Sequence, residues 1–312
     1  MPQDYEVEHL LKLGNEVGEG PLWSSEHQTI YWVDIPKHLI YRYDLENENL
    51  EVFDVGLPVG ALALRESGGI VAATKRGFAF WDFLSEDLVF LVDPEEDKPE
   101  TRFNDAAVDR CGRFWAGTMS DSDPHGPHGS LYRLDPDGSV ARMDTGFTVS
   151  NGIGWSPDDK IMYFTDTMRS VIYAYDFDIA AGTLENRRSF VTVPDGEGFP
   201  DGLTVDSEGF VWSAIALGYK INRYAPDGVL EREIQVPTAF VSSCTFGGPG
   251  LDELYITTGW EPLNDEEKLS QPFAGDLFRL YTGVMGLEEP VSYTHLRAHE
   301  TEADLVCRLL LE

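Results

Sequence analysis

Short apolar segments recur along the chain, each followed by a polar turn and a second segment rich in aromatic and β-branched residues. The first repeat begins with Glu19-Gly-Pro-Leu-Trp23 and continues through a polar turn into IYWVD. Five further copies of this pattern begin at Gly60, Asn104, Asn151, Asp201 and Ser242. Successive copies start 41 to 50 residues apart. Periods of this length, with several short strands in each, are typical of propeller blades. The pattern therefore predicts an all-β fold, a six-bladed β-propeller.

The two ends of the repeat region also carry strand patterns. Residues 5–13 alternate before the first repeat, and the segment Leu277–Tyr281 follows the sixth. Pairing these segments would remove an exposed sheet edge, so we expect one closed propeller over residues 1–290. From about Val291 the alternation stops. Residues 291–312 resemble translated sequencing-adapter sequence, and our hypothesis is that this tail is not native; a genuine C-terminal helix is the alternative.

The first residue of each repeat is expected just ahead of an inner strand, where equivalent positions of all blades face the central channel. Four of these six positions carry a carboxylate or an amide oxygen, namely Glu19, Asn104, Asn151 and Asp201. Oxygen ligands that include two carboxylates suit a hard divalent cation. Asn-Gly and Asp-Gly are also common turn dipeptides. Glu19 has little reason to occupy a turn, so the convergence favours a central metal site.

Net charge narrows the range of partners. The 312 residues include 55 acidic and 23 basic ones, for a formal net charge of -32. Nucleic acid and anionic membrane surfaces would repel such a chain. A solvated acidic surface explains the charge more simply than cation binding does. No apolar run approaches the ~20 residues of a membrane-spanning helix, and the first residues lack a signal-peptide pattern. We therefore expect a cytoplasmic protein, with Cys111, Cys244 and Cys307 as free thiols.

Four longer motifs carry a family resemblance. The stretches VGEGPLW, RFNDAAVDRCGRFWAGTM, SNGIGWSPDDKIMYFTDT and PDGLTVDSEGFVW resemble the gluconolactonase, regucalcin and senescence-marker-protein family, from about residue 14 to residue 290. The resemblance implies a metal held by Glu19, Asn151 and Asp201, with Asp201 also the candidate general base. It further implies substrate contacts from Arg102 and Asn104. An ordinary surface ion pair is the alternative for Arg102.

The chain departs from the family after the GTM motif, where family members often place an acidic residue that contacts the substrate. Our best register puts Ser122 at this position, between Asp121 and Asp123. We assign Asp121 and Ser122 to substrate binding, although both aspartates could equally be solvated loop charges. The nearby His125 and His128 are expected to lie in a loop that faces solvent.

These observations favour a metal-dependent hydrolase that opens a small sugar-type lactone. Calcium is the first expectation for the single divalent ion, with zinc, magnesium, manganese and iron open. A bound ion would polarise the lactone carbonyl while water attacks, and Asp201 would take the proton from that water; a metal-bound hydroxide is a rival arrangement. The alternatives are a non-catalytic calcium-binding regulatory protein, an esterase or phosphotriesterase, and a scaffold for other proteins. The chain lacks the repeated WD dipeptide of propeller scaffolds, and the pattern leaves monomer and dimer open.

Overall fold

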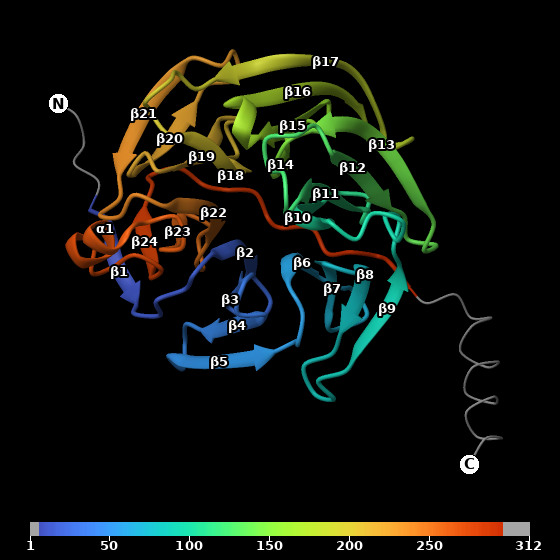
Figure 1. Cartoon of the computed structure of the whole chain (residues 1–312), viewed down its shortest axis with the longest axis horizontal. Coiled ribbons are helices and arrows are strands. Elements are labelled where there is room, and N and C mark those ends of the chain that lie inside the picture. Colours follow the sequence, from blue (N-terminus) through green and yellow to red (C-terminus); the bar gives the residue numbers. More distant parts are fainter. Residues whose placement is uncertain (1–5, 296–312) are drawn as a thin grey trace.

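The computed structural model describes residues 6–295, which form six four-stranded antiparallel sheets arranged around a central axis (Figure 1). The first three blades consist of β2 (Gly18–Ser24), β3 (Thr29–Asp34), β4 (Leu39–Asp44) and β5 (Asn49–Asp54); β6 (Val59–Leu64), β7 (Ile70–Thr74), β8 (Gly77–Trp81) and β9 (Leu88–Val92); and β10 (Thr101–Val108), β11 (Phe114–Ser120), β12 (Gly129–Leu134) and β13 (Val140–Phe147).

The other three blades consist of β14 (Ser150–Trp155), β15 (Ile161–Asp166), β16 (Val171–Asp178) and β17 (Thr183–Thr192); β18 (Phe199–Val205), β19 (Val211–Ala216), β20 (Lys220–Tyr224) and β21 (Leu230–Gln235); and β22 (Val241–Gly247), β23 (Glu253–Thr258), β24 (Leu277–Tyr281) and β1 (Glu8–Leu11). The predicted six-bladed propeller is therefore confirmed.

Each predicted repeat begins in an innermost strand. One detail of the prediction is wrong: the repeat-start residues lie within strands β2, β6, β10, β14, β18 and β22, and not just ahead of them. Apolar side chains of neighbouring blades pack against each other between these strands. Trp115 of β11, for example, contacts Trp155 of β14 with their ring centroids 6.2 Å apart. Burial of such large rings between blades supplies much of the stabilising free energy.

The ring closes by pairing the two ends of the repeat region, as the alternation predicted. Strand β1 pairs antiparallel with β24 in the sixth blade. Asp276, which precedes β24, fastens this junction: its Oδ1 accepts hydrogen bonds from the backbone N–H groups of Leu13 (2.7 Å) and Gly14 (3.0 Å). Its Oδ2 lies 2.8 Å from Nε2 of His9. Closure therefore rests on a buried carboxylate as well as on strand pairing.

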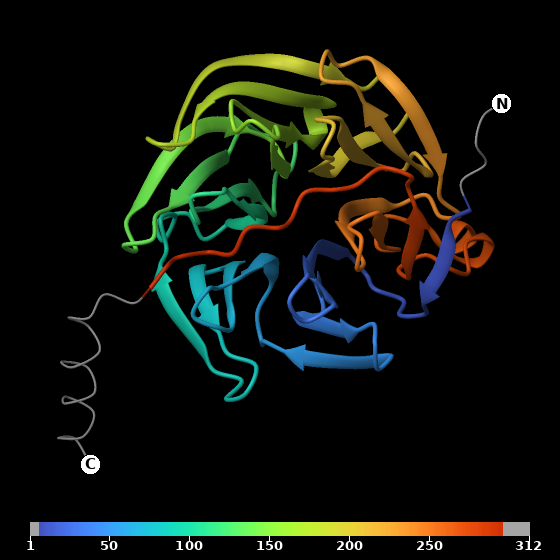
Figure 2. The same cartoon turned by 180° about the vertical axis from the view of Figure 1, so that it is seen from behind.

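After β24, residues 282–295 form a C-terminal strap that crosses one end of the ring, drawn in red in Figure 2. Ser292 joins the second blade, where its N–H donates to the Leu64 carbonyl (2.8 Å) and its carbonyl accepts from the Glu66 N–H (3.0 Å). Residues 296–312 lie outside the described residues, so the hypothesis of a non-native tail stays a prediction.

Helices are few in the described part of the chain. It contains the 3-10 turn η1 (Thr167–Arg169) and the α-helix α1 (Asp265–Ser270). Neither is long and apolar enough to cross a membrane, and this holds for every helix within residues 6–295. Cys111 and Cys244 are free thiols, as expected, whereas Cys307 lies outside the described residues.

Candidate functional site

A break in strand register occurs at or next to each of the six repeat-start residues. In β10, for example, Phe103 pairs with Thr118 and Asp105 pairs with Gly117, which leaves Asn104 as an extra residue. Equivalent shifts occur in the other five inner strands. A bulge of this kind re-aims side chains and is frequent next to functional sites. The bulges therefore re-aim the side chains at the repeat-start positions. All of these side chains are buried, and only Gly60 has none.

Two carboxylates predicted from the repeat phase are buried here. Glu19 is 5% exposed and Asp201 is 4% exposed. Burial raises the pKa of Glu19 well above its ordinary value, and the charges of Asp201 and Asp105 raise it further. Burial and the charge of Asp105 likewise raise the pKa of Asp201. The Oδ1 atom of Asp201 has no hydrogen-bond partner in the described part of the chain. Negative charge is thus concentrated where little water can solvate it.

Asp105 is a third buried carboxylate that the sequence analysis missed. It is 7% exposed, and burial raises its pKa to about 7 against the opposing effect of hydrogen bonds from the backbone N–H groups of Ala106 and Gly152. Strict strand alternation would place Asp105 on the opposite face from Asn104. The bulge at Asn104 removes this alternation. The acidic residue directly after Asn104 in RFND was the only signal in the sequence.

The predicted amide and guanidinium groups form a connected network. Arg102 Nη1 donates to Asn104 Oδ1 (2.7 Å), and Asn104 Nδ2 donates to Asn151 Oδ1 (3.0 Å). Asn151 Nδ2 in turn donates to Thr167 Oγ1 (2.9 Å). The Arg102 side chain is only 15% exposed, and burial lowers its pKa. Arg102 is therefore not an ordinary surface ion pair, and it lies in the same network as the predicted metal ligand Asn151.

The loop after the GTM motif contributes one of its residues to this network. Asp121 accepts hydrogen bonds from Arg102 Nε (2.8 Å) and from Lys75 Nζ (2.6 Å). Ser122 is exposed, and its hydroxyl lies 3.3 Å from Ser120 Oγ. Asp121 is therefore brought to Arg102 and is not a freely solvated loop charge. The predicted role of Ser122 in substrate binding stays a prediction.

Two other residues of this loop pair with each other. Asp123 Oδ2 lies 3.0 Å from His128 Nε2, and both side chains are about half exposed. This agrees with the expected solvent-facing loop.

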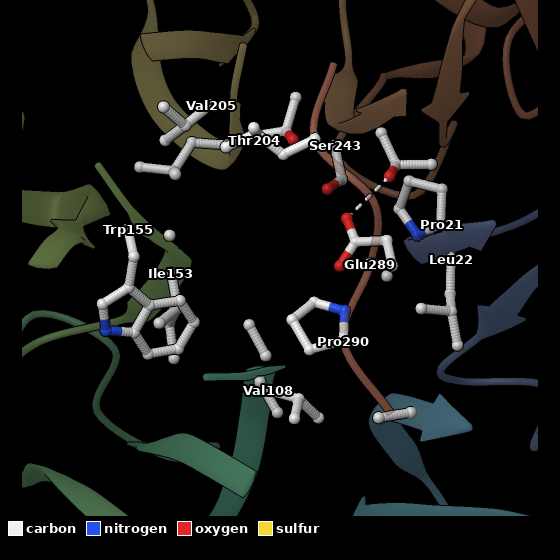
Figure 3. Close-up of a pocket in the computed structure, with 18 of the residues that line it drawn as sticks. Pro21, Leu22, Val108, Ile153, Trp155, Thr204, Val205, Ser243, Glu289 and Pro290 are labelled. Atoms are coloured by element: carbon white, nitrogen blue, oxygen red, sulfur yellow. Dashed lines mark hydrogen bonds between the residues drawn. The ribbon is translucent and has the colours of Figure 1, made fainter. Parts of the chain in front are cut away.

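A cavity lies beneath the C-terminal strap (Figure 3), and Asp105 of the buried carboxylate cluster forms part of its wall. Leu22, Val108 and Trp155 form part of its wall, and it has ≈ 90 Å³ of water-accessible space. Glu289 of the strap lies inside it and accepts a hydrogen bond from Thr245 Oγ1 (3.1 Å). The strap therefore covers a cavity that adjoins the buried carboxylate cluster through Asp105.

The predicted ligands fit a hard divalent cation by their chemistry. Glu19, Asn151 and Asp201 offer only oxygen donors at this site, and the Asp201 oxygen that lacks a hydrogen-bond partner is available as a ligand. Within residues 6–295 no group of three or more His, Cys, Asp or Glu side chains has a metal-binding arrangement. The predicted set includes only two such residues, because its third member is an asparagine.

Six four-stranded blades and a buried cluster of acids and amides at one channel end define a propeller protein with a polar central site. Within this class, the profile of the SMP-30/Gluconolactonase/LRE-like region matches residues 17–259. The chain belongs to this family, as the sequence motifs indicated.

Individual relatives cover almost the whole chain. Regucalcin of Danio rerio is 37% identical over 291 residues, which make up 92% of this chain and 98% of the relative. Regucalcin of Homo sapiens is 34% identical over 295 residues, with the same two coverages.

Solved structures agree in fold. A calcium-binding protein, regucalcin, from Agrobacterium tumefaciens superimposes with a TM-score of 0.88 at 26% identity, covering 92% of this chain and 97% of that one. A gluconolactonase from Xanthomonas campestris has a TM-score of 0.71 at 28% identity, with 89% of each chain covered. The family and its gluconolactonase members support a lactonase-like role.

Proposed function

We propose that the chain is a metal-dependent hydrolase that opens a small sugar-type lactone. The observation that carries this proposal is the buried Asp201 oxygen without a hydrogen-bond partner, in a site shared with Glu19 and the Arg102–Asn104–Asn151 network. Glu19, Asn151 and Asp201 would hold one divalent cation, with Ca²⁺ the first expectation. Such an ion supplies Lewis-acid polarisation of a carbonyl oxygen. Membership of a family that includes gluconolactonases supports the same reaction class.

The side chains of the site transfer the proton and bind the substrate. Asp201 accepts the proton of the attacking water, a role worth roughly 10²–10⁴-fold in rate. The same proton then passes to the ring oxygen that leaves, so ring opening yields one hydroxy acid with no other reactant. Arg102 donates hydrogen bonds to substrate hydroxyls, and the network fixes Asn104 beside it. Burial of these groups limits competition from bulk water.

A calcium-binding protein without turnover is the second candidate. It is favoured by the regucalcin relatives and by the description of the Agrobacterium tumefaciens neighbour as a calcium-binding protein. The same donor set would then serve binding alone. An esterase or phosphotriesterase on this site is a third possibility, because a divalent ion also polarises a phosphoryl oxygen.

The decisive experiment measures proton release on metal-stripped protein after Ca²⁺, Mg²⁺, Mn²⁺, Zn²⁺ or Fe²⁺ is added back. The substrates are a panel of aldonolactones and one phosphotriester, with Asp201→Ala as the control. Metal-dependent lactone opening that is lost in the variant is the expected result. Metal binding without turnover of any substrate would favour the calcium-binding candidate, whereas turnover of only the phosphotriester would favour the third.

We also propose a small-molecule lactone as the substrate partner, in a monomer or a dimer, and the cytoplasm as the location. Free thiols support a reducing compartment, and Cys111 is exposed and unpaired within the described residues. The strong acidity opposes nucleic acid and anionic membranes as partners.

A further inference from the structure

Lys75 lies in the two-residue turn between β7 and β8, in the second blade. The turn meets the loop after β11 in the third blade, where Lys75 Nζ donates to Asp121 Oδ2 (2.6 Å). The lysine side chain is 27% exposed and that of Asp121 is 44% exposed. A pair this exposed contributes little to global stability. Its position is more informative than its strength, because it lies at one end of a chain of hydrogen bonds.

That chain runs from the rim of the channel to the predicted metal ligand. Asp121 accepts from Lys75 through one oxygen and from Arg102 Nε (2.8 Å) through the other. Arg102 then donates to Asn104, and Asn104 donates to Asn151. Each link has a fixed direction, because lysine and arginine only donate and an ionised carboxylate only accepts. The orientation of each amide in the chain is therefore set from the rim inward.

Arg102 is attracted by more than one carboxylate. Besides Asp121, the charges of Glu19 and Glu261 act on its pKa. An arginine released from Asp121 would be drawn toward these carboxylates. Asp121 lies on an exposed loop, and the contact from Lys75 gives it a second fixed point. The Lys75 contact therefore decides how firmly Asp121 can hold the guanidinium.

The orientation leaves Arg102 with donor capacity. Nε contacts Asp121, and Nη1 contacts Asn104 and the Phe103 carbonyl (3.0 Å). Nη2 makes no hydrogen bond with any residue between 6 and 295, so its N–H groups are available to a ligand. A planar guanidinium that is held at two points presents its remaining donors in a fixed direction. Such donors suit the adjacent hydroxyls of a polyhydroxylated ring.

We propose that Lys75 is a positioning residue which, through Asp121, fixes Arg102 to bind the hydroxyl groups of the substrate and so sets selectivity for polyhydroxylated over plain lactones. This inference rests on the proposed lactonase function. Lys75 acts through another residue and does not touch the reacting atoms.

The test compares Lys75→Met with the wild-type holoenzyme on two substrates, an aldonolactone and the unsubstituted δ-valerolactone. For the aldonolactone we expect KM to rise about tenfold, the scale of one charge-assisted hydrogen bond. We expect kcat for both substrates, KM for δ-valerolactone and the calorimetric Ca²⁺ affinity to change less than about twofold. Lys75→Arg should restore most of the aldonolactone KM, because arginine can also reach and pair with Asp121.

Arg76→Met is the matched control. It removes the same charge from the same turn, but its guanidinium stacks on Phe90 (4.6 Å to the ring centroid). We expect this variant to keep the wild-type KM for both lactones. An equal rise in KM for both substrates in Lys75→Met, or the same effect in Arg76→Met, would overturn the positioning role.

Failure of the proposed function can be told apart from failure of this inference. If the wild-type holoenzyme opens no lactone, the proposed function fails, and calorimetric binding of the aldonolactone then decides the role of Lys75. Weaker binding in Lys75→Met but not in Arg76→Met would support it. Unchanged binding in both variants, or no binding to the wild type, would overturn it.

Discussion

Burying three carboxylates in the channel lowers the free energy of unfolding, because these groups lose their hydration. Glu19, Asp105 and Asp201 are each less than a tenth exposed. Burial raises the pKa of all three, and the charges of neighbouring carboxylates raise those of Glu19 and Asp201 further. Groups perturbed in this way cluster at functional sites, because packing alone would favour neutral residues there. A bound cation would offset the cost.

Asp201→Asn tests this cost directly. In the presence of a chelator we expect the variant to melt a few degrees above the wild type, since the amide carries no charge to bury. Calcium should stabilise the wild type, by about 2.7 kcal/mol at a hundred times the dissociation constant, and leave the variant unchanged. Lactone turnover should fall at least ~100-fold. Thermal unfolding with and without Ca²⁺, together with initial rates, measures these effects.

Asp206→Asn is the matched control for that variant. Asp206 is fully buried but paired, accepting from Arg223 Nη2 (2.6 Å) and Trp212 Nε1 (2.9 Å). Removing the charge of a paired carboxylate leaves Arg223 without its buried partner, so we expect a lower melting temperature with or without calcium. A similar loss in chelated Asp201→Asn would contradict the view that Asp201 is uncompensated.

The stability of the metal-free protein should vary with pH because Asp105 is buried. The pKa of Asp105 is about 7 in the folded state, against ~3.9 in an unfolded chain. Between these values Asp105 binds its proton more tightly in the folded state, so the stability that Asp105 contributes falls as pH rises from about 4 to 7. We expect the melting temperature in chelator to decrease over this window, and Asp105→Asn to flatten the decrease. If the melting temperature of the variant decreased with pH as steeply as that of the wild type, Asp105 would not be the group that is protonated in the folded state.

The positions at which the repeats begin predicted most of the site, but not the residues that lie beside it in the structure. Glu19, Asn104, Asn151 and Asp201 could be found because each begins a repeat. Asp105 could not, since its direction depends on a bulge created by pairing with the next strand. Lys75 was missed because the residue that it contacts is 46 positions away on a different blade.

At the scale of the elements, the strands were predictable because their signals are local. Alternation, turn residues and a regular period are written in consecutive residues, and each inner strand falls on its predicted repeat. The register shifts depend on which residues of two strands face each other. The path of the strap over the channel depends on contacts with distant blades. Neither has a local signal in the sequence.

The junction between β1 and β24 should depend on Asp276. Asp276→Ala leaves the N–H groups of Leu13 and Gly14 without their acceptor and removes the contact with His9. We expect a loss of about 2 kcal/mol, seen as a melting temperature lower by roughly 4–8 °C. Asp276→Asn, which keeps an acceptor oxygen, should lose less.

Asp158→Ala is the comparison for this variant. It removes a carboxylate that pairs with Lys160 (3.0 Å) in an exposed turn. Its melting temperature should stay near that of the wild type, as expected for an exposed pair. If Asp158→Ala and Asp276→Ala lowered the melting temperature equally, the contacts of Asp276 at the junction would contribute no more to stability than an exposed ion pair.

At the scale of the whole molecule, the charge of -32 opposes a compact fold. Many basic residues offset it locally by pairing with acids on neighbouring strands, as Arg279 does with Glu8 (2.8 Å) and Glu253 (3.1 Å). With 55 acidic and 23 basic residues, most carboxylates have no such partner to neutralise them. Long-range repulsion among the remaining charges is therefore a general destabilising term, separate from the buried cluster in the channel.

Sodium chloride should therefore stabilise the protein even when a chelator removes divalent ions. The screening length falls from about 10 Å at 0.1 M salt to about 3 Å at 1 M, which weakens repulsion over the whole surface. Exposed ion pairs are worth too little for their screening to cancel this gain. We expect the melting temperature to rise by several degrees between low salt and 0.5 M NaCl, equally in the wild type and in Asp201→Asn. Sodium sulfate at equal ionic strength separates screening from the exclusion of sulfate from protein surfaces. A flat or falling melting temperature in NaCl would mean that the ion pairs between strands outweigh the net repulsion.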